Sequence, residues 1–163
     1  MRRLIFTTIF LVTSLLRVGA AEPMLKIVST EATVAFTAEE FAALPRAEAT
    51  VVEPRENNQQ HYSGVAVREL LTRAGVPMGE KFRGAALGLA VVVHCKDGYA
   101  VLFSLAEFEE GFSSRTIVLA DRVDGDILPP SAAPLRIIVP GDKRPARSAR
   151  QVTSLEIVSL GKP

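Results

Sequence analysis

The apolar residues of this chain fall into short segments, and the spacing within each segment predicts the element it forms. Brief runs rich in branched and aromatic residues, separated by turn residues, predict β-strands. The strands predicted in this way are residues 25–29, 33–36, 49–53, 87–95, 99–103, 116–120, 135–139 and 151–160. The run 87–95 is nearly continuous and rich in valine, so we expect a central strand buried on both faces. Asp97-Gly98 follows it and predicts a hairpin turn.

Three other segments predict short helices. Residues 37–40 and 104–107 each contain a capping box, in which a hydroxyl and a carboxylate satisfy backbone groups at a helix start. Within 65–74, apolar residues recur at i, i+3, i+4 and i+7, which predicts an amphipathic helix that ends at Gly75. Residues 54–60 are polar and turn-like. Strands dominate and no regular alternation of strand and helix is present, so we expect a mixed, mainly β fold of the α+β class with about three short helices.

The first 24 residues have a different character from the rest. Met1-Arg2-Arg3 is a short positive segment, residues 4–16 are almost entirely apolar, and small residues follow up to Ala21. An apolar run this short falls below the ~20 residues of a membrane span, so we expect a cleavable signal peptide over residues 1–20 and a single domain over 21–163. An uncleaved anchor or a buried helix is the alternative. The flanks of the arginine pair fit general secretion better than twin-arginine export, and we expect a bacterial periplasmic protein with no stable membrane span after cleavage.

The composition of the chain excludes several classes of protein. The chain has 163 residues, of which 48% are hydrophobic and 23% charged, which suits one domain with a core and excludes wholesale disorder. The net charge of +1 becomes −2 when residues 1–20 are removed, which argues against a nucleic-acid partner. A single cysteine excludes an intramolecular disulfide and a cysteine-rich zinc site.

Basic residues concentrate in one short stretch near the C-terminus. Within 15 residues only Asp142 opposes the positive charges, so the local charge is +4. The basic residues are Arg136, Lys143, Arg144, Arg147 and Arg150. Prolines and a glycine make the stretch a loop, and arginine forks pair with phosphates and carboxylates. The stretch is therefore either an anion-binding site or a solvated basic loop.

The histidines and the cysteine give weaker indications. His94 and Cys95 are adjacent in a predicted strand, so their side chains point to opposite faces and do not converge on one metal ion. We expect Cys95 in the core and predict no metal site. His61 lies with Tyr62 in a predicted polar loop, where it either lines a cleft or is simply exposed.

The order of several segments resembles a known family. These segments are residues 61–75, with an aromatic, Gly-Val, Leu-Leu and Ala-Gly pattern; Asp97-Gly98-Tyr99, followed by residues 103–105; the stretch 134–141; and a last strand at 152–158. Together they resemble the oxidoreductase molybdopterin-binding domain family, with its sulfite-oxidase-like fold, over roughly residues 49–160. The resemblance implies a molybdenum–pterin cofactor whose phosphate is held by basic residues near the Pro-Gly loop.

By this resemblance, the cofactor-binding candidates are Arg136, Lys143, Arg144, Arg147 and His61. Arg136 would be a structural or cofactor arginine, and the next three would lie where phosphate contacts are expected.

Three departures from the family pattern shape the functional hypothesis, and one of them is the poor fit of the arginine pair to the twin-arginine route that a cofactor inserted in the cytoplasm would need. Catalytic members hold molybdenum through a cysteine upstream of the Leu-Leu helix, but residues 53–58 contain none, and Cys95 lies in a different strand. Family members usually have His-Gly just before the Pro-Leu-Arg stretch, and this chain has Ala132-Ala133 there. We therefore expect an exported module without the molybdenum-binding cysteine, which binds an anionic small molecule or a redox or sensory protein partner. The alternative is a molybdopterin-dependent periplasmic oxidoreductase with atypical metal ligation or a partner subunit.

Overall fold

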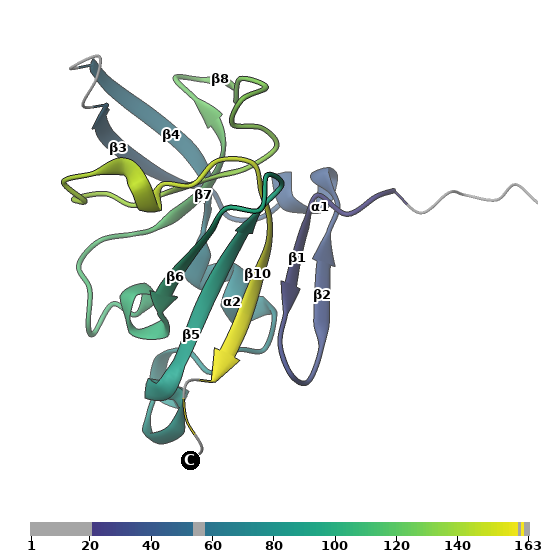
Figure 1. The fold of residues 1–163 in the computed structure, drawn as a ribbon, viewed down its shortest axis with the longest axis vertical. Helices are drawn as coiled ribbons and strands as arrows, with labels where there is room; N and C mark the ends of the chain where they lie inside the picture. The colour runs from purple at the N-terminus through teal and green to yellow at the C-terminus, as the bar shows by residue number, and fades with distance from the viewer. Residues whose placement is uncertain (1–20, 54–57, 160, 162–163) are drawn as a thin grey trace, which may run out of the picture.

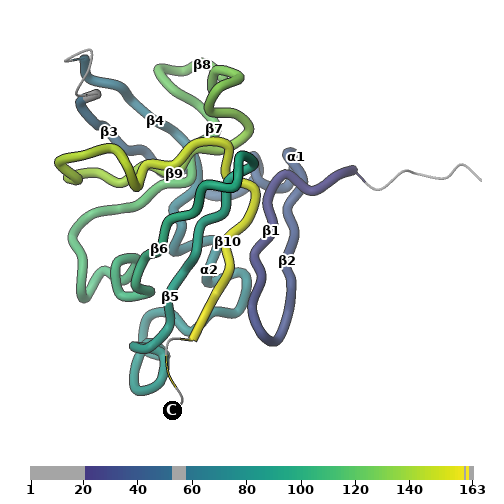
Figure 2. Tube along the Cα trace, in the orientation of Figure 1, coloured from purple at the N-terminus to yellow at the C-terminus, as the bar shows by residue number. Residues whose placement is uncertain are grey.

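Two five-stranded β-sheets form the framework of the protein (Figure 1). The computed structural model describes residues 21–53, 58–159 and 161. The first sheet contains β1 (Leu25–Val28), β2 (Thr33–Phe36), β5 (Leu89–Cys95), β6 (Ala100–Ser104) and β10 (Val152–Ser159) in the order β2-β1-β10-β5-β6. β1 pairs with β10 in parallel, so the first described strand lies beside the last one, as the trace in Figure 2 shows.

The second sheet carries the residues that precede the basic loop. Its strands are β3 (Ala47–Glu53), β4 (Asn58–Ala66), β7 (Val118–Val123), β8 (Asp126–Ile127) and β9 (Arg136–Ile138). The order is β3-β4-β7-β8, and β9 also pairs with β7. β9 is short and wholly buried, and it leads directly into the loop that connects the two sheets through β10.

Two α-helices and four 3₁₀ turns complete the fold. They are α1 (Ala38–Ala42), α2 (Val67–Arg73), η1 (Gly79–Lys81), η2 (Gly84–Gly88), η3 (Leu105–Phe108) and η4 (Pro145–Arg147). Both predicted capping boxes are present, at Thr37 with Glu40 and at Ser104 with Glu107. The prediction of a mixed, mainly β fold is confirmed.

The segment before α2 differs from the prediction. The sequence predicts a turn that includes residues 58–60, a polar loop at His61 and Tyr62, and a helix from Val65, but residues 58–66 all belong to β4. β4 pairs with β3 on one side and with β7 on the other, for example His61 with Thr50 and Val65 with Leu119. Pairing on both edges keeps this polar segment extended, and the helix therefore begins only at Val67.

The larger of two hydrophobic clusters joins the sheets. It contains Leu25 and Leu155 from the first sheet, and Leu119 and Ile137 from the second. Within β5, the side chains of Val91, Val93 and Cys95 are buried, but Val92 and His94 are partly exposed. The prediction that this strand is buried on both faces is therefore wrong, because only its inner face packs against the core.

The predicted signal peptide, residues 1–20, lies outside the described residues. In the part of the chain that the structure describes, no helix is long and apolar enough to cross a membrane.

Candidate functional site

The basic loop, residues 140–150, connects β9 to β10 and is folded back onto its own base. The N–H of Ile137 donates to the carbonyl of Ala149 at 3.0 Å, and the N–H of Val139 donates to the hydroxyl of Ser148 at 3.1 Å. Gly141, at a φ of +82°, provides the left-handed conformation that the turn after β9 requires. These bonds fix the start and the end of the loop next to each other.

Arg136 is buried at the base of this loop, with 5% of its surface exposed. Its Nη1 donates to the hydroxyl of Tyr62, its Nε donates to the carbonyl of Ser148 at 3.4 Å, and its guanidinium carbon lies 5.1 Å from the centroid of the Tyr62 ring. A buried charge is costly unless hydrogen bonds hold it. These contacts therefore set the position and the orientation of the guanidinium.

A cavity of about 540 Å³ opens beside Arg136. Its polar lining comes from the β5–β6 turn, from the segment between β8 and β9, from β9, and from the end of the basic loop with the residue that follows it. It consists of Asp97, Tyr99, Ser131, Arg136, Ser148, Arg150 and Gln151. The hydroxyl of Tyr99 donates to the carbonyl of Ala146 at 3.0 Å, which joins the β5–β6 turn to the loop. We call this cavity the arginine pocket. Two guanidinium groups and one carboxylate give it the chemistry to hold an anionic molecule that also carries a hydrogen-bond donor.

Arg147 is held by a separate cluster. Its Nε and Nη2 donate to the two carboxylate oxygens of Asp142, each at 2.8 Å, and its Nη1 donates to Glu107 Oε2 at 2.8 Å. Arg115 donates to the same carboxylates, at 2.7 Å to Glu107 Oε2 and 2.8 Å to Asp142 Oδ1. The guanidinium of Arg147 also lies over the Phe103 ring, 4.9 Å from its centroid. We call Glu107, Arg115, Asp142 and Arg147 the ion-pair ring.

The hydrogen bonds of the ion-pair ring shift the pKa values of Asp142 and Arg147. The hydrogen bond from Arg147 holds the pKa of the Asp142 carboxyl below its ordinary value, against the opposing effect of burial. The hydrogen bond to Asp142 raises the pKa of Arg147 above that of a free guanidinium. Asp142 therefore stays negatively charged and Arg147 positively charged at neutral pH.

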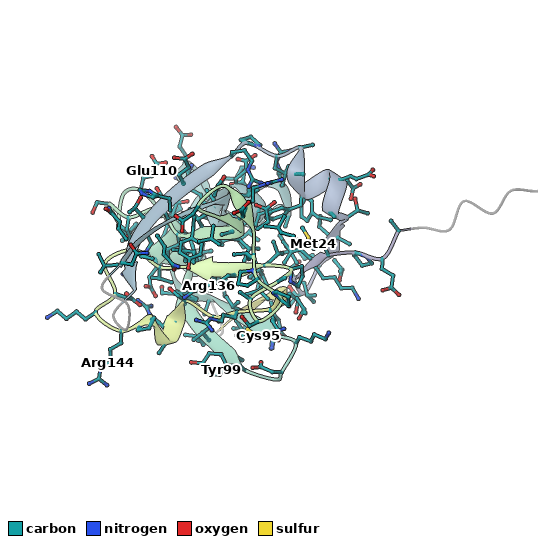
Figure 3. All side chains as sticks on the ribbon, turned by 90° about the horizontal axis from the view of Figure 1, so that it is seen from above. Met24, Cys95, Tyr99, Glu110, Arg136 and Arg144 are labelled. Atoms are coloured by element: carbon teal, nitrogen blue, oxygen red, sulfur yellow. The ribbon has the colours of Figure 1, made fainter. Side chains whose placement is uncertain are left out.

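The structure brings together only some of the residues predicted from the sequence. Arg136 and Arg150 both line the arginine pocket. Lys143 and Arg144 are exposed and are not among its lining residues; Arg144 extends away from the body of the protein in Figure 3, whereas Arg136 lies within it. His61 lies on β4, also outside that lining, with its Nδ1 3.0 Å from the hydroxyl of Thr50.

Three residues that hold the arginines of the site in place were not predicted from the sequence. The sequence predicts Tyr62 in a loop, whereas it occupies a buried position of β4, against the guanidinium of Arg136. Arg115 stands in a segment with no periodicity, so no pattern connected it to Asp142. Glu107 was recognised only for its capping role, which uses Oε1 and leaves Oε2 for the ion-pair ring.

Cys95 tests whether the described residues fit a cysteine-bound metal. It is the single cysteine of the chain, and its side chain belongs to the larger core, with 7% of the residue's surface exposed. Burial, together with the nearby charge of Asp97, raises the pKa of its thiol, which disfavours a thiolate. No group of three or more His, Cys, Asp or Glu side chains within the described ranges is placed to hold a metal ion. The described residues therefore do not fit molybdenum bound through a thiolate.

Comparison with known proteins places the fold. The model of a family described as the oxidoreductase molybdopterin binding domain matches residues 29–161. Among solved structures, the sulfane dehydrogenase SoxCD from Paracoccus pantotrophus superposes with a TM-score of 0.64 at 20% sequence identity. The match covers 82% of this chain but only 37% of that one, so this chain spans little more than a third of the length of its structural relative. No curated protein matches the chain.

Proposed function

Since the chain belongs to the oxidoreductase molybdopterin-binding domain family, we propose that it is a ligand-binding module of that family that works without cysteine-bound molybdenum. Its ligand is a small anionic molecule held in the arginine pocket. The single observation that carries this proposal is Arg136, a buried guanidinium that Tyr62 and Ser148 hold in place at the wall of a cavity of about 540 Å³.

The two arginines of the pocket have different parts in this proposal. Arg136 is buried at the wall of the cavity and oriented in advance, so it loses little freedom when an anion binds. Arg150 is exposed and approaches the ligand from the outer side of the pocket. Asp97, which lines the same cavity, selects against small inorganic anions and favours a ligand with a hydrogen-bond donor beside its anionic group.

Export and a partner belong to the same proposal. The character of residues 1–20 supports secretion to the periplasm, where the module would meet its ligand. Lys143 and Arg144 are exposed on the basic loop next to the pocket, and this positive rim suits an acidic face of a redox or sensory protein partner.

The test is calorimetric titration of the mature protein with an aromatic carboxylate, an aromatic sulfonate and inorganic phosphate. We expect saturable binding of at least one organic anion. Arg150→Ala should weaken that binding at least about tenfold, because a charge-assisted hydrogen bond is worth about 1.5–3 kcal/mol.

Arg83→Ala is the matched control. Arg83 is also exposed, stands at the start of η2 and is outside the lining of the arginine pocket, so its removal should leave the affinity unchanged. Failure of all three anions to bind, or equal binding by wild type and Arg150→Ala, contradicts the proposal. Recovery of the protein with one molybdenum per chain would favour the alternative, a molybdopterin-dependent oxidoreductase with atypical metal ligation or a partner subunit.

A further inference from the structure

The ion-pair ring is a closed arrangement of two guanidinium groups and two carboxylates. Glu107 Oε2 accepts from both Arg115 and Arg147, and Asp142 Oδ1 also accepts from both. Asp142 Oδ2 accepts from the Nε of Arg147 as well. Three carboxylate oxygens thus face one pair of arginines. A phosphate monoester presents the same number of oxygens, and paired arginines are a common way to bind it.

The ion-pair ring joins three segments of the chain. Glu107 belongs to η3, Arg115 to the segment before β7, and both Asp142 and Arg147 to the basic loop. The four side chains are 15–31% exposed, which shields their interactions from solvent more than those of an ordinary surface pair. The charges within the ring cancel, so the loop can close on η3 without an anion from solution.

We propose that Glu107 and Asp142 serve as a built-in anion: they occupy the Arg115–Arg147 pair, close the basic loop in the absence of a bound phosphate, and exclude phosphate-bearing ligands from this pair. The basic loop of this molybdopterin-binding fold therefore closes through carboxylates of its own chain and does not need the phosphate of a cofactor. The inference does not depend on the ligand of the arginine pocket, whose lining includes none of the four ring residues.

The inference predicts that removing the two carboxylates creates an anion site. The double variant Glu107→Gln/Asp142→Asn keeps the size of both side chains but leaves the two guanidinium groups without a counter-charge. Inorganic phosphate titrated into this variant should bind at least about tenfold more tightly than to wild type. In nuclear magnetic resonance spectra, the Nε signals of Arg115 and Arg147 should shift during the titration.

Glu31→Gln/Asp126→Asn is the matched control. It changes the net charge by the same amount at two exposed acidic residues that lie outside the ion-pair ring. The control should bind phosphate like wild type, with no shift at Arg115 or Arg147. A folded double variant that binds phosphate no better than this control overturns the inference. Shifts confined to the arginine pocket would concern the proposed function and leave the ring without an anion site, which also overturns the inference.

Amide hydrogen exchange of wild type gives a second test that does not require the variant to fold. The amides of Val139 and Ser148 are hydrogen-bonded when the basic loop is closed. They should exchange slowly in phosphate-free buffer, and adding phosphate should not slow them further. Rapid exchange that phosphate suppresses would show that the loop needs an external anion, and would overturn the inference.

Discussion

Among the glycines in the described part of the chain, Gly64 has the least room for a side chain. A Cβ atom at this position would lie 2.0 Å from the carbonyl oxygen of Leu119 and 2.5 Å from the Cα of Ala120, both backbone atoms of β7. The register between β4 and β7 shifts at this point, between Ser63 and Gly64. The absence of a side chain therefore permits a close approach of the two strands just beyond Tyr62, which supports Arg136.

Gly64→Ala should accordingly lower the free energy of unfolding by about 2–3 kcal/mol, because the backbone of β7 has to move. Urea denaturation of the purified variants measures this loss. Gly111→Ala is the control, since a Cβ there meets no atom within 4 Å. Equal midpoints for the two variants would show that β4 and β7 are not packed as closely as described.

Alternation along a strand was a reliable guide at the residue scale. It predicted that His94 and Cys95 point to opposite faces. The Nε2 of His94 indeed lies 2.8 Å from a carboxylate oxygen of Glu156, while Cys95 is buried in the larger core. The period of two holds for any extended backbone and needs no tertiary information. The surroundings of Arg136 were not predictable in this way, because Tyr62 is 74 residues earlier in the chain.

At the scale of elements, structure that depends on neighbouring residues was predicted correctly. Structure that depends on pairing with distant strands was not. Both capping boxes form, because all their hydrogen bonds lie within three residues. The residues of β4 have the composition of a loop that leads into a helix, and their extended form comes from pairing with β3 and β7.

The capping box of η3 allows a prediction for the site. Ser104→Ala removes the hydroxyl that accepts from the N–H of Ala106, and it should lower the free energy of unfolding by about 1 kcal/mol. Because Glu107 caps η3 through one oxygen and bonds the ion-pair ring through the other, amide exchange in the basic loop should also accelerate. Ser114→Ala, at an exposed serine before β7, should change neither quantity. A stability loss without faster loop exchange would mean that η3 and the ion-pair ring are not coupled.

The ion-pair ring also predicts how stability depends on pH. The pKa of Asp142 is lower in the folded protein than its ordinary value, so its contribution to stability is complete above the range where a free Asp titrates, about pH 4. The contribution is lost as the pH falls through the folded-state pKa. Asp142→Asn should therefore destabilise the protein at neutral pH and flatten the loss of stability on acidification. Thermal unfolding from pH 7 to pH 3 tests this, and parallel curves for wild type and variant would contradict it.

At the scale of the whole molecule, the sequence predicted the class of fold but not the arrangement of its two sheets. β1 pairs with β10, and the sheets share a core to which β5, β7 and β9 all contribute. Such contacts join segments far apart in the chain and leave no local pattern. The order of the segments that resemble the family did indicate it, and the match over residues 29–161 confirms the family. They did not indicate that Arg147 would bind Asp142 and Glu107 within its own chain.

The central proposal is that this fold functions here without a bound molybdenum cofactor. The most direct measurement is the metal and pterin content of the protein, purified under mild conditions from cells supplied with molybdate, with mass-spectrometric quantification of both. The burial of Cys95 and the occupied Arg147 predict a folded protein with molybdenum and pterin far below one per chain. One molybdenum and one pterin per chain, lost on unfolding and absent from protein made without molybdate, would contradict the proposal.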